Sequence, residues 1–87
     1  MFVVLAYDVQ SKRVTKVMKI VKKYLSPTQK SVYEGFLSEG KLNSLKRELV
    51  AKIEPEKDCV IIYEFDGYGL PKKWILGKNS HTDRTFL

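Results

Sequence analysis

The sequence predicts an α+β domain in which two helices cover one face of a sheet. Apolar runs typical of strands, at residues 2–9 and 58–65, are separated by two segments whose apolar residues recur at helical spacing, at residues 11–25 and 39–53. The chain has 87 residues, which is enough for one small domain. We therefore expect one folded unit over residues 1–78 and a C-terminal tail at residues 79–87.

The first strand is expected at residues 2–9, because this run is almost continuously apolar and rich in β-branched and aromatic side chains. The first helix is expected at residues 11–25, with an N-cap at Ser11. The Ser26-Pro27 pair ends it, because the residue before a proline is pushed out of the α region. Its apolar side consists of Val14, Val17, Met18, Val21 and Leu25.

The segment between the two helices has to supply two strands. Residues 29–37 alternate enough to predict a strand, with Gly35 as a bend or bulge. However, residues 26–38 contain no Asn-Gly or Asp-Gly hairpin signal. We expect either a sharp fold at Glu34-Gly35 or one bent strand that serves for two.

The second half of the chain repeats the helix-to-strand order. Ser38 can cap a helix over about residues 39–53, which a strongly apolar strand follows at residues 58–65. A short final strand is expected at residues 74–77. The apolar side of this helix consists of Leu42, Leu45, Leu49, Val50 and Ile53. The resulting order is that of a ferredoxin-like βαββαβ sandwich with a short extra C-terminal strand.

Both faces of the predicted sheet require burial. Residues 2–7 and 59–63 are apolar without a break, whereas two helices can cover only one face of such a sheet. Leaving the second face in water costs about 25 cal/mol per Å² of apolar area. A second copy of the chain, packed sheet to sheet, removes this cost, so we expect a homodimer.

Positive charge is concentrated in one part of the chain. The net charge is +6, and no acidic residue occurs between Asp8 and Glu34. The basic residues in this interval are Lys12, Arg13, Lys16, Lys19, Lys22, Lys23 and Lys30. Those at 12, 16, 19 and 23 form one stripe along the predicted helix, opposite its apolar side. Such a stripe can follow a phosphate backbone, or it can be a solvated helix face.

The composition predicts a soluble cytoplasmic protein that does not associate with a membrane. Cys59 stands alone in an apolar run, which favours a core position, and a chain without a disulfide framework fits a reducing compartment. No stretch approaches the ~18 apolar residues that a membrane span needs. The N-terminus also lacks the charged segment of a signal peptide.

Asp8 is the conspicuous acidic residue, because it ends a predicted buried strand and precedes the basic helix. One interpretation is a strand-ending or helix-capping aspartate, which is common at β-to-α turns. The other is a metal ligand. One carboxylate is a poor Mg²⁺ site, but a two-fold axis would bring two copies of Asp8 together around one ion.

Four segments resemble, in order and spacing, the CRISPR-associated Cas-two family, and they extend over nearly the whole chain. They are the strand ending in Tyr7-Asp8-Val9 with the basic stretch after it, the segment from Gln29 to Gly35, the segment from Asp58 to Tyr63, and Ile75-Leu76-Gly77. The second is similar to the family pattern Q-x-S-V-F-E-G and the third to D-S-V-x-x-Y. The chain has Tyr33 where the pattern has Phe, and it lacks the arginine that many members carry just before the second segment.

The resemblance implies a ferredoxin-like homodimer whose C-terminal strand adds to the partner's sheet. It also implies a Mg²⁺-dependent endonuclease that cleaves RNA or DNA phosphodiester bonds in CRISPR spacer acquisition, a form of antiviral defence. Asp8 matches the catalytic metal-binding aspartate, and one Mg²⁺ or Mn²⁺ would be shared across the dimer. The residues expected to bind nucleic acid are Tyr7, Lys12, Arg13, Lys16, Lys19, Ser31 and Tyr33.

Members of this family are known equally as scaffolds that join integrase subunits and hold spacer DNA. The expected partners are therefore a second copy of the chain, the CRISPR integrase subunit, and RNA or DNA. In a scaffold, the basic surface would bind DNA and Asp8 could be structural. A toxin-like RNA-cleaving protein, or a non-catalytic RNA-binding module on the same fold, is a third hypothesis. The sequence leaves the choice open.

Overall fold

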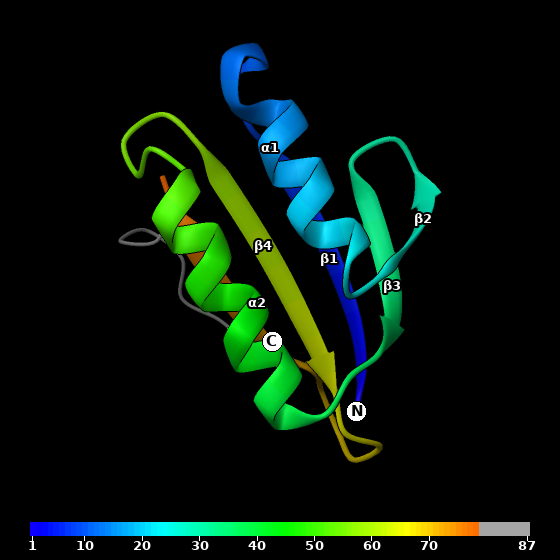
Figure 1. Cartoon of the computed structure of the whole chain (residues 1–87). Helices are drawn as coiled ribbons and strands as arrows, with labels where there is room; N and C mark the ends of the chain where they lie inside the picture. The colour runs from blue at the N-terminus through cyan, green and yellow to red at the C-terminus, as the bar shows by residue number, and fades with distance from the viewer. Residues whose placement is uncertain (79–87) are drawn as a thin grey trace.

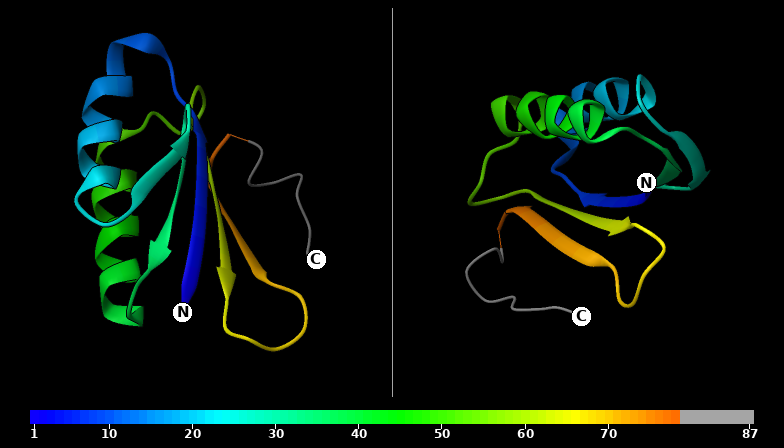
Figure 2. Two further views of the ribbon diagram at one scale, coloured as in Figure 1. Left: turned by 90° about the vertical axis from the view of Figure 1, so that its right-hand side faces the viewer. Right: turned by 90° about the horizontal axis from the view of Figure 1, so that it is seen from below.

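A computed structural model of the chain describes residues 1–78; the predicted tail at residues 79–87 lies outside the described residues. The elements are β1 (Phe2–Asp8), α1 (Ser11–Lys22), β2 (Ser26–Gln29), β3 (Val32–Phe36), α2 (Glu39–Lys52), β4 (Cys59–Phe65) and β5 (Lys72–Gly77). The strands form one antiparallel sheet in the order β2-β3-β1-β4-β5 (Figure 1). Figure 2 shows both helices on one face of this sheet. The predicted ferredoxin-like fold with an extra C-terminal strand is confirmed.

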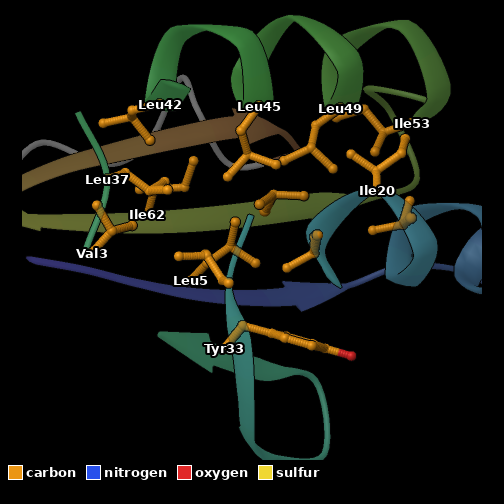
Figure 3. Packing of buried hydrophobic residues seen from close by; sticks show 14 residues of the cluster. Val3, Leu5, Ile20, Tyr33, Leu37, Leu42, Leu45, Leu49, Ile53 and Ile62 are labelled. Carbon is orange, nitrogen blue, oxygen red and sulfur yellow. The ribbon is translucent and has the colours of Figure 1, made fainter. Parts of the chain in front are cut away.

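The core lies between the helices and the sheet (Figure 3). From α2, Leu42, Leu45 and Leu49 point toward the sheet, where Leu5 and Ile62 are fully buried. Because side chains alternate along a strand, the even-numbered residues of β1 point to the opposite face. The remaining members of the core include Val3, Val17, Val21, Tyr33 and Val60.

The predictions for the two helices need three corrections. Gln10, not Ser11, is the N-cap of α1, and its side chain makes no capping hydrogen bond. The helix ends at Lys22, before the predicted end, and the Ser26-Pro27 pair begins β2 instead. Val50 is 55% exposed on α2 and does not belong to the core. The Ser38 cap is confirmed, since its hydroxyl accepts from the Lys41 amide at 3.1 Å.

The chain reverses at Lys30-Ser31, so both predictions for the middle segment are wrong. Ser31 has a φ of 64°, the left-handed conformation that a tight hairpin turn requires and that Gly or Asn usually provides. Gly35 is not a bulge, and the ladder irregularity lies between Pro27 and Gln29. A Cβ at Gly35 would lie 3.2 Å from Leu25 Cδ2, so a small residue is needed there for packing.

The C-terminal strand β5 pairs with β4 of its own chain, with partners from Glu64–Lys72 to Cys59–Gly77. The resemblance implied a strand added to the partner's sheet. β5 is the last strand of this sheet, with β4 on one side only, so addition to a partner stays a prediction. The Trp74 Nε1 donates to Glu64 Oε1 at 2.9 Å, and the Lys46 Nζ of α2 lies 3.6 Å from the Trp74 ring centroid. These contacts hold β5 against its own sheet and helix.

Candidate functional site

The sheet face opposite the helices is mostly apolar, and no element of residues 1–78 covers it (Figure 2). At one end, the Phe2 ring centroid lies 5.0 Å from that of Phe36 and 6.2 Å from that of Phe65. Phe36 is 80% exposed. Val4, Ala6, Ile61, Tyr63 and Ile75 continue this surface along the neighbouring strands. A contiguous apolar patch of this kind usually marks a contact with another protein.

Asp8 lies on the same open face, at the other end of β1 from the phenylalanine cluster. It is exposed and makes no side-chain hydrogen bond or ion pair with residues 1–78. It is the last residue of β1, but the N-cap of α1 is Gln10. The helix-capping interpretation of Asp8 is therefore wrong, and its carboxylate is available to a ligand.

Residues 1–78 contain no group of three or more His, Cys, Asp or Glu side chains that could hold a metal ion. Cys59 pairs with Asp8 across the β1–β4 ladder and is buried, as expected. Burial, and then the negative charge of Asp8, raise the pKa of the Cys59 thiol and keep it protonated. The Asp8 carboxylate oxygens suit Mg²⁺ or Mn²⁺, and a second carboxylate beside them would make a better site for such an ion than one carboxylate alone.

A buried carboxylate fixes the connection that follows Asp8. Asp58 Oδ1 accepts from the Gln10 amide at 3.0 Å and from Arg13 Nη2 at 2.9 Å. Its Oδ2 accepts from Arg13 Nε at 2.6 Å and from the Glu54 amide at 2.8 Å. The Arg13 hydrogen bonds, helped by those backbone amides, outweigh burial and hold the pKa of Asp58 far below its usual range.

No motif predicts this role for Asp58, but two signals in the sequence point to it. An acidic residue at the start of a strongly apolar strand needs a cation if it is buried. Arg13 is the one arginine in an otherwise lysine-rich block, and only a guanidinium offers the two-pronged contact seen here. Arg13, predicted to bind nucleic acid, thus lies in a structural ion pair.

The predicted lysine stripe is largely exposed. Lys12, Lys16 and Lys19 are exposed on α1 and form no ion pair within residues 1–78. The fourth lysine of the stripe differs, since Lys23 Nζ lies 2.5 Å from Glu48 Oε1 on α2. The first three lysines are therefore available to a polyanion, whereas Lys23 joins the two helices.

Three of the predicted nucleic-acid-binding residues, Tyr7, Ser31 and Tyr33, meet at a groove of about 450 Å³ between α1 and the β2–β3 hairpin. The Tyr7 and Tyr33 rings stack with centroids 5.9 Å apart, and the Tyr7 amide donates to the Ser31 carbonyl at 3.1 Å. Burial and the neighbouring Tyr33 raise the pKa of Tyr7 to about 12, although Ser31 acts in the opposite direction. The Tyr7 hydroxyl is therefore protonated at neutral pH.

The predicted site residues thus occupy four places. Asp8 lies on the open sheet face, the two tyrosines and Ser31 at the groove, and Arg13 against Asp58. Lys12, Lys16 and Lys19 lie on the exposed side of α1. The end of β1, the β2–β3 turn and the start of α1 lie at the same end of the sheet (Figure 1).

Known proteins are similar to this chain in sequence and fold. The family model described as CRISPR associated protein Cas2 matches residues 1–71, which includes the strand with Asp8 and the hairpin with Ser31. The chain belongs to the Cas2 family. The match ends directly before β5.

Two relatives illustrate the similarity to Cas2 proteins. One from Moorella thermoacetica, named CRISPR-associated endoribonuclease Cas2 2, is 39% identical over 87 residues, which cover 92% of this chain and 96% of the relative. One from Thermotoga maritima, named CRISPR-associated endoribonuclease Cas2, is 47% identical over 66 residues, which cover 76% of each chain.

Solved Cas2 structures have the same fold. A crystal structure described as cas2 matches with a TM-score of 0.73 and 40% identity, covering 80% of this chain and 82% of that one. The crystal structure of Streptococcus pyogenes Cas2 at pH 6.5 matches with a TM-score of 0.68 and 27% identity, covering 75% of this chain and 86% of that one. In this chain, no helix among residues 1–78 has the length and apolar character needed to cross a membrane.

Proposed function

We propose that this Cas2 chain is a metal-dependent endoribonuclease that acts as a homodimer, with the Asp8 side chains of the two copies at its centre. The observation that carries the proposal is the position of Asp8, an exposed carboxylate without a partner in residues 1–78, on an uncovered apolar sheet face. Relatives at 39% and 47% identity are named endoribonucleases, which supports cleavage of RNA.

A second copy of the chain is the partner that this face requires. A sheet-to-sheet contact buries the aromatic cluster of Phe2, Phe36 and Phe65. Because a two-fold axis duplicates every residue near it, the same contact can bring two Asp8 carboxylates together. Two carboxylates with one proton or one cation between them are more stable than two bare charges at close range. Dimer formation and the metal site are thus linked in this proposal.

The chain's own residues would bind the ion and hold the RNA strand. The two Asp8 carboxylates would be the protein ligands, and Mg²⁺ or Mn²⁺ is the class of ion that such oxygen donors select. When bound, such an ion supplies charge neutralisation at a phosphate and a lowered pKa for water. Lys12, in the first turn of α1 after Asp8, would hold the neighbouring phosphate. Asp58 and Arg13 keep that first turn in place.

A second role, as a DNA-binding scaffold for the CRISPR integrase subunit, is favoured by one observation. Lys12, Lys16 and Lys19 are exposed on α1, and the helices cover the sheet face opposite Asp8 (Figure 2). A basic surface on the helical side can bind a nucleic-acid backbone without any contribution from the carboxylate. The two roles share Lys12, but the scaffold role does not need the Asp8 carboxylate, so they are compatible with each other.

A cleavage assay with single-stranded RNA and DNA of the same sequence tests the proposed activity. We expect RNA cleavage that requires Mg²⁺ or Mn²⁺, is blocked by a chelator, and is abolished in Asp8→Asn. The matched control is Glu56→Gln, which neutralises an exposed acid in the connection before β4. Full cleavage by Asp8→Asn, with contaminating nuclease excluded, would contradict the proposal. If no protein cleaves either substrate, the scaffold role remains.

A further inference from the structure

The groove between α1 and the β2–β3 hairpin has the features of a ligand site that the proposed cleavage centre does not use. We propose that it binds one unpaired nucleobase of an RNA strand, with an adjacent phosphate held by Lys22 and Lys30. The proposal rests on the proposed function only in taking RNA as the ligand. It adds a site for a nucleobase to the proposed Asp8 centre, which would contact only the sugar-phosphate backbone of the RNA.

The walls of the groove suit a flat, mostly apolar group. Val14 and Met18 line it from α1, and Pro27 lines it from β2. Its volume of about 450 Å³ is within the usual range for sites that bind small molecules. A nucleobase, with two apolar faces and a polar edge, matches walls of this kind.

Hydroxyl groups provide the polar part of the groove. Tyr7 and Tyr33 stack against each other, and the Tyr33 ring is buried while its hydroxyl oxygen points away from the core residues (Figure 3). Tyr7, Tyr33 and Ser31 all line the groove. Each hydroxyl can both donate and accept a hydrogen bond, which suits the mixed donors and acceptors of a base edge.

Ser31 is present at a turn position where glycine would be less strained. Its φ of 64° is a conformation that side chains other than those of Asn and Asp rarely adopt. Serine costs stability there relative to glycine, and it contributes a hydroxyl to the groove. A strained residue that lines a groove favours a binding role for its side chain.

The charges around the groove select an anionic ligand. Lys22 on α1 and Lys30 in the turn both line it and are exposed, and none of the acidic residues within 1–78 lines it. An uncharged apolar peptide would gain nothing from two lysines, and a free phosphate would gain nothing from the apolar walls. A nucleotide within an RNA strand uses both features.

The groove also lies close to the proposed cleavage centre in the fold. Tyr7 and Asp8 are neighbours in β1 with side chains on opposite faces, and the β2–β3 turn lies at that end of the sheet (Figure 1). The Tyr7 amide bonds to the Ser31 carbonyl and holds this turn against β1. A strand of RNA that passes over this end would therefore meet both places, and the groove would favour particular bases near the cleaved bond.

Binding of fluorescently labelled RNA, measured in chelator so that no cleavage occurs, tests the groove independently of the nuclease activity. The probes are a short oligouridylate and a strand of the same length without bases. The variants are Ser31→Gly, which suits the turn, and Tyr33→Phe, which keeps the ring in the core. An exposed pair, Lys41→Ala with Lys52→Ala, is the control for Lys22→Ala with Lys30→Ala.

We expect the wild-type protein to bind the strand with bases more tightly than the strand without them. Ser31→Gly combined with Tyr33→Phe should lose roughly ten-fold in affinity for the strand with bases and nothing for the other. A factor of ten corresponds to about 1.4 kcal/mol of binding free energy, the scale of the lost hydrogen bonds. Lys22→Ala with Lys30→Ala should weaken both strands more than the control pair does. Equal binding of the two strands by wild type, or no effect of the hydroxyl variants, would overturn the proposal. If the protein prefers the strand with bases but does not cleave RNA, the result would support base binding in the groove and would refute only the proposed nuclease activity.

Discussion

Arg13 Nε lies 2.6 Å from Asp58 Oδ2, and this ion pair joins the first turn of α1 to the residue before β4. The same carboxylate accepts from the amides of Gln10 and Glu54, and the Asp58 carbonyl accepts from the Lys78 amide at 2.7 Å. One buried residue thus fixes three segments at the end of the sheet where Asp8 lies. Both the stability of the chain and the placement of Asp8 depend on it.

Replacing Asp58 with alanine should strongly destabilise the chain. The change leaves two backbone amides and a mostly buried guanidinium without their acceptor. We expect the midpoint of thermal unfolding, followed by circular dichroism, to fall by on the order of 10 °C or more. Glu56→Ala, a change two residues earlier at an exposed acid, should shift the midpoint little. Equal midpoints for the two variants would show that the ion pair contributes nothing measurable.

The same ion pair predicts loss of stability in acid. The pKa of Asp58 is lower in the folded chain than in the unfolded chain, so its contribution is fully present above the unfolded value of about 3.9 and is lost as the pH falls below it. Chemical denaturation between neutral pH and pH 3 measures this. In Asp58→Asn, the fall in stability with pH should be shallower.

Glu48→Gln is the comparison for the acid prediction. The pKa of Glu48 is also lowered, by Lys23 first and then by Tyr24, but its side chain is 34% exposed and the pair is screened by solvent. This variant should keep most of the pH dependence of the parent protein. A pH profile changed more by Glu48→Gln than by Asp58→Asn would contradict the assignment.

The exposed lysines of α1 should dominate the salt dependence of nucleic-acid binding. Replacing Lys12, Lys16 and Lys19 with alanine should weaken binding and reduce the log–log slope with salt by roughly 0.7–0.9 for each phosphate that a lysine no longer neutralises. Fluorescence anisotropy at several salt concentrations gives the slope. A matched triple variant on α2, Lys41, Arg47 and Lys52 to alanine, removes the same charge elsewhere. Identical salt slopes for the two triple variants would show that the lysine stripe is a solvated helix face without a special role in binding.

The open sheet face predicts a dimer that one substitution can break. Sedimentation of the wild type at micromolar concentration should give twice the mass of the chain. Phe36→Lys places a charge in the aromatic cluster and should shift the protein toward monomer. Val50→Lys changes an exposed apolar residue on α2 and should leave the dimer intact. A wild-type protein that sediments as a monomer at this concentration would contradict the proposed dimer.

The fold could be predicted largely from local patterns, because the strands and helices of this chain have clear periodicity. The apolar residues of α2 at 42, 45 and 49 are one example. The β2–β3 hairpin could not be predicted, because Ser31 occupies the left-handed turn position where glycine or asparagine is the usual signal. The pairing of β5 with its own sheet depends on Trp74, Glu64 and Lys46, which are distant in sequence.

The candidate site, like the fold, could be predicted from the sequence only in part. Asp8 could be singled out because an acid that ends an apolar strand is conspicuous. The ion pair of Arg13 with Asp58 could not be predicted, because it joins residues 45 positions apart. A run of basic residues also does not show which of them is paired. The groove beside Tyr7 and Ser31 likewise depends on a hairpin that the sequence does not signal.

The measurement that tests the central claim most directly is ribonuclease activity in dimers of mixed composition. Wild-type and Asp8→Asn chains are co-expressed at known ratios, and metal-dependent RNA cleavage is measured against the fraction of wild-type chains. If both Asp8 carboxylates form one site, only pure wild-type dimers are active, and an equal mixture should retain about a quarter of the activity. If each chain acts alone, the mixture retains about half, and that result would contradict a shared site.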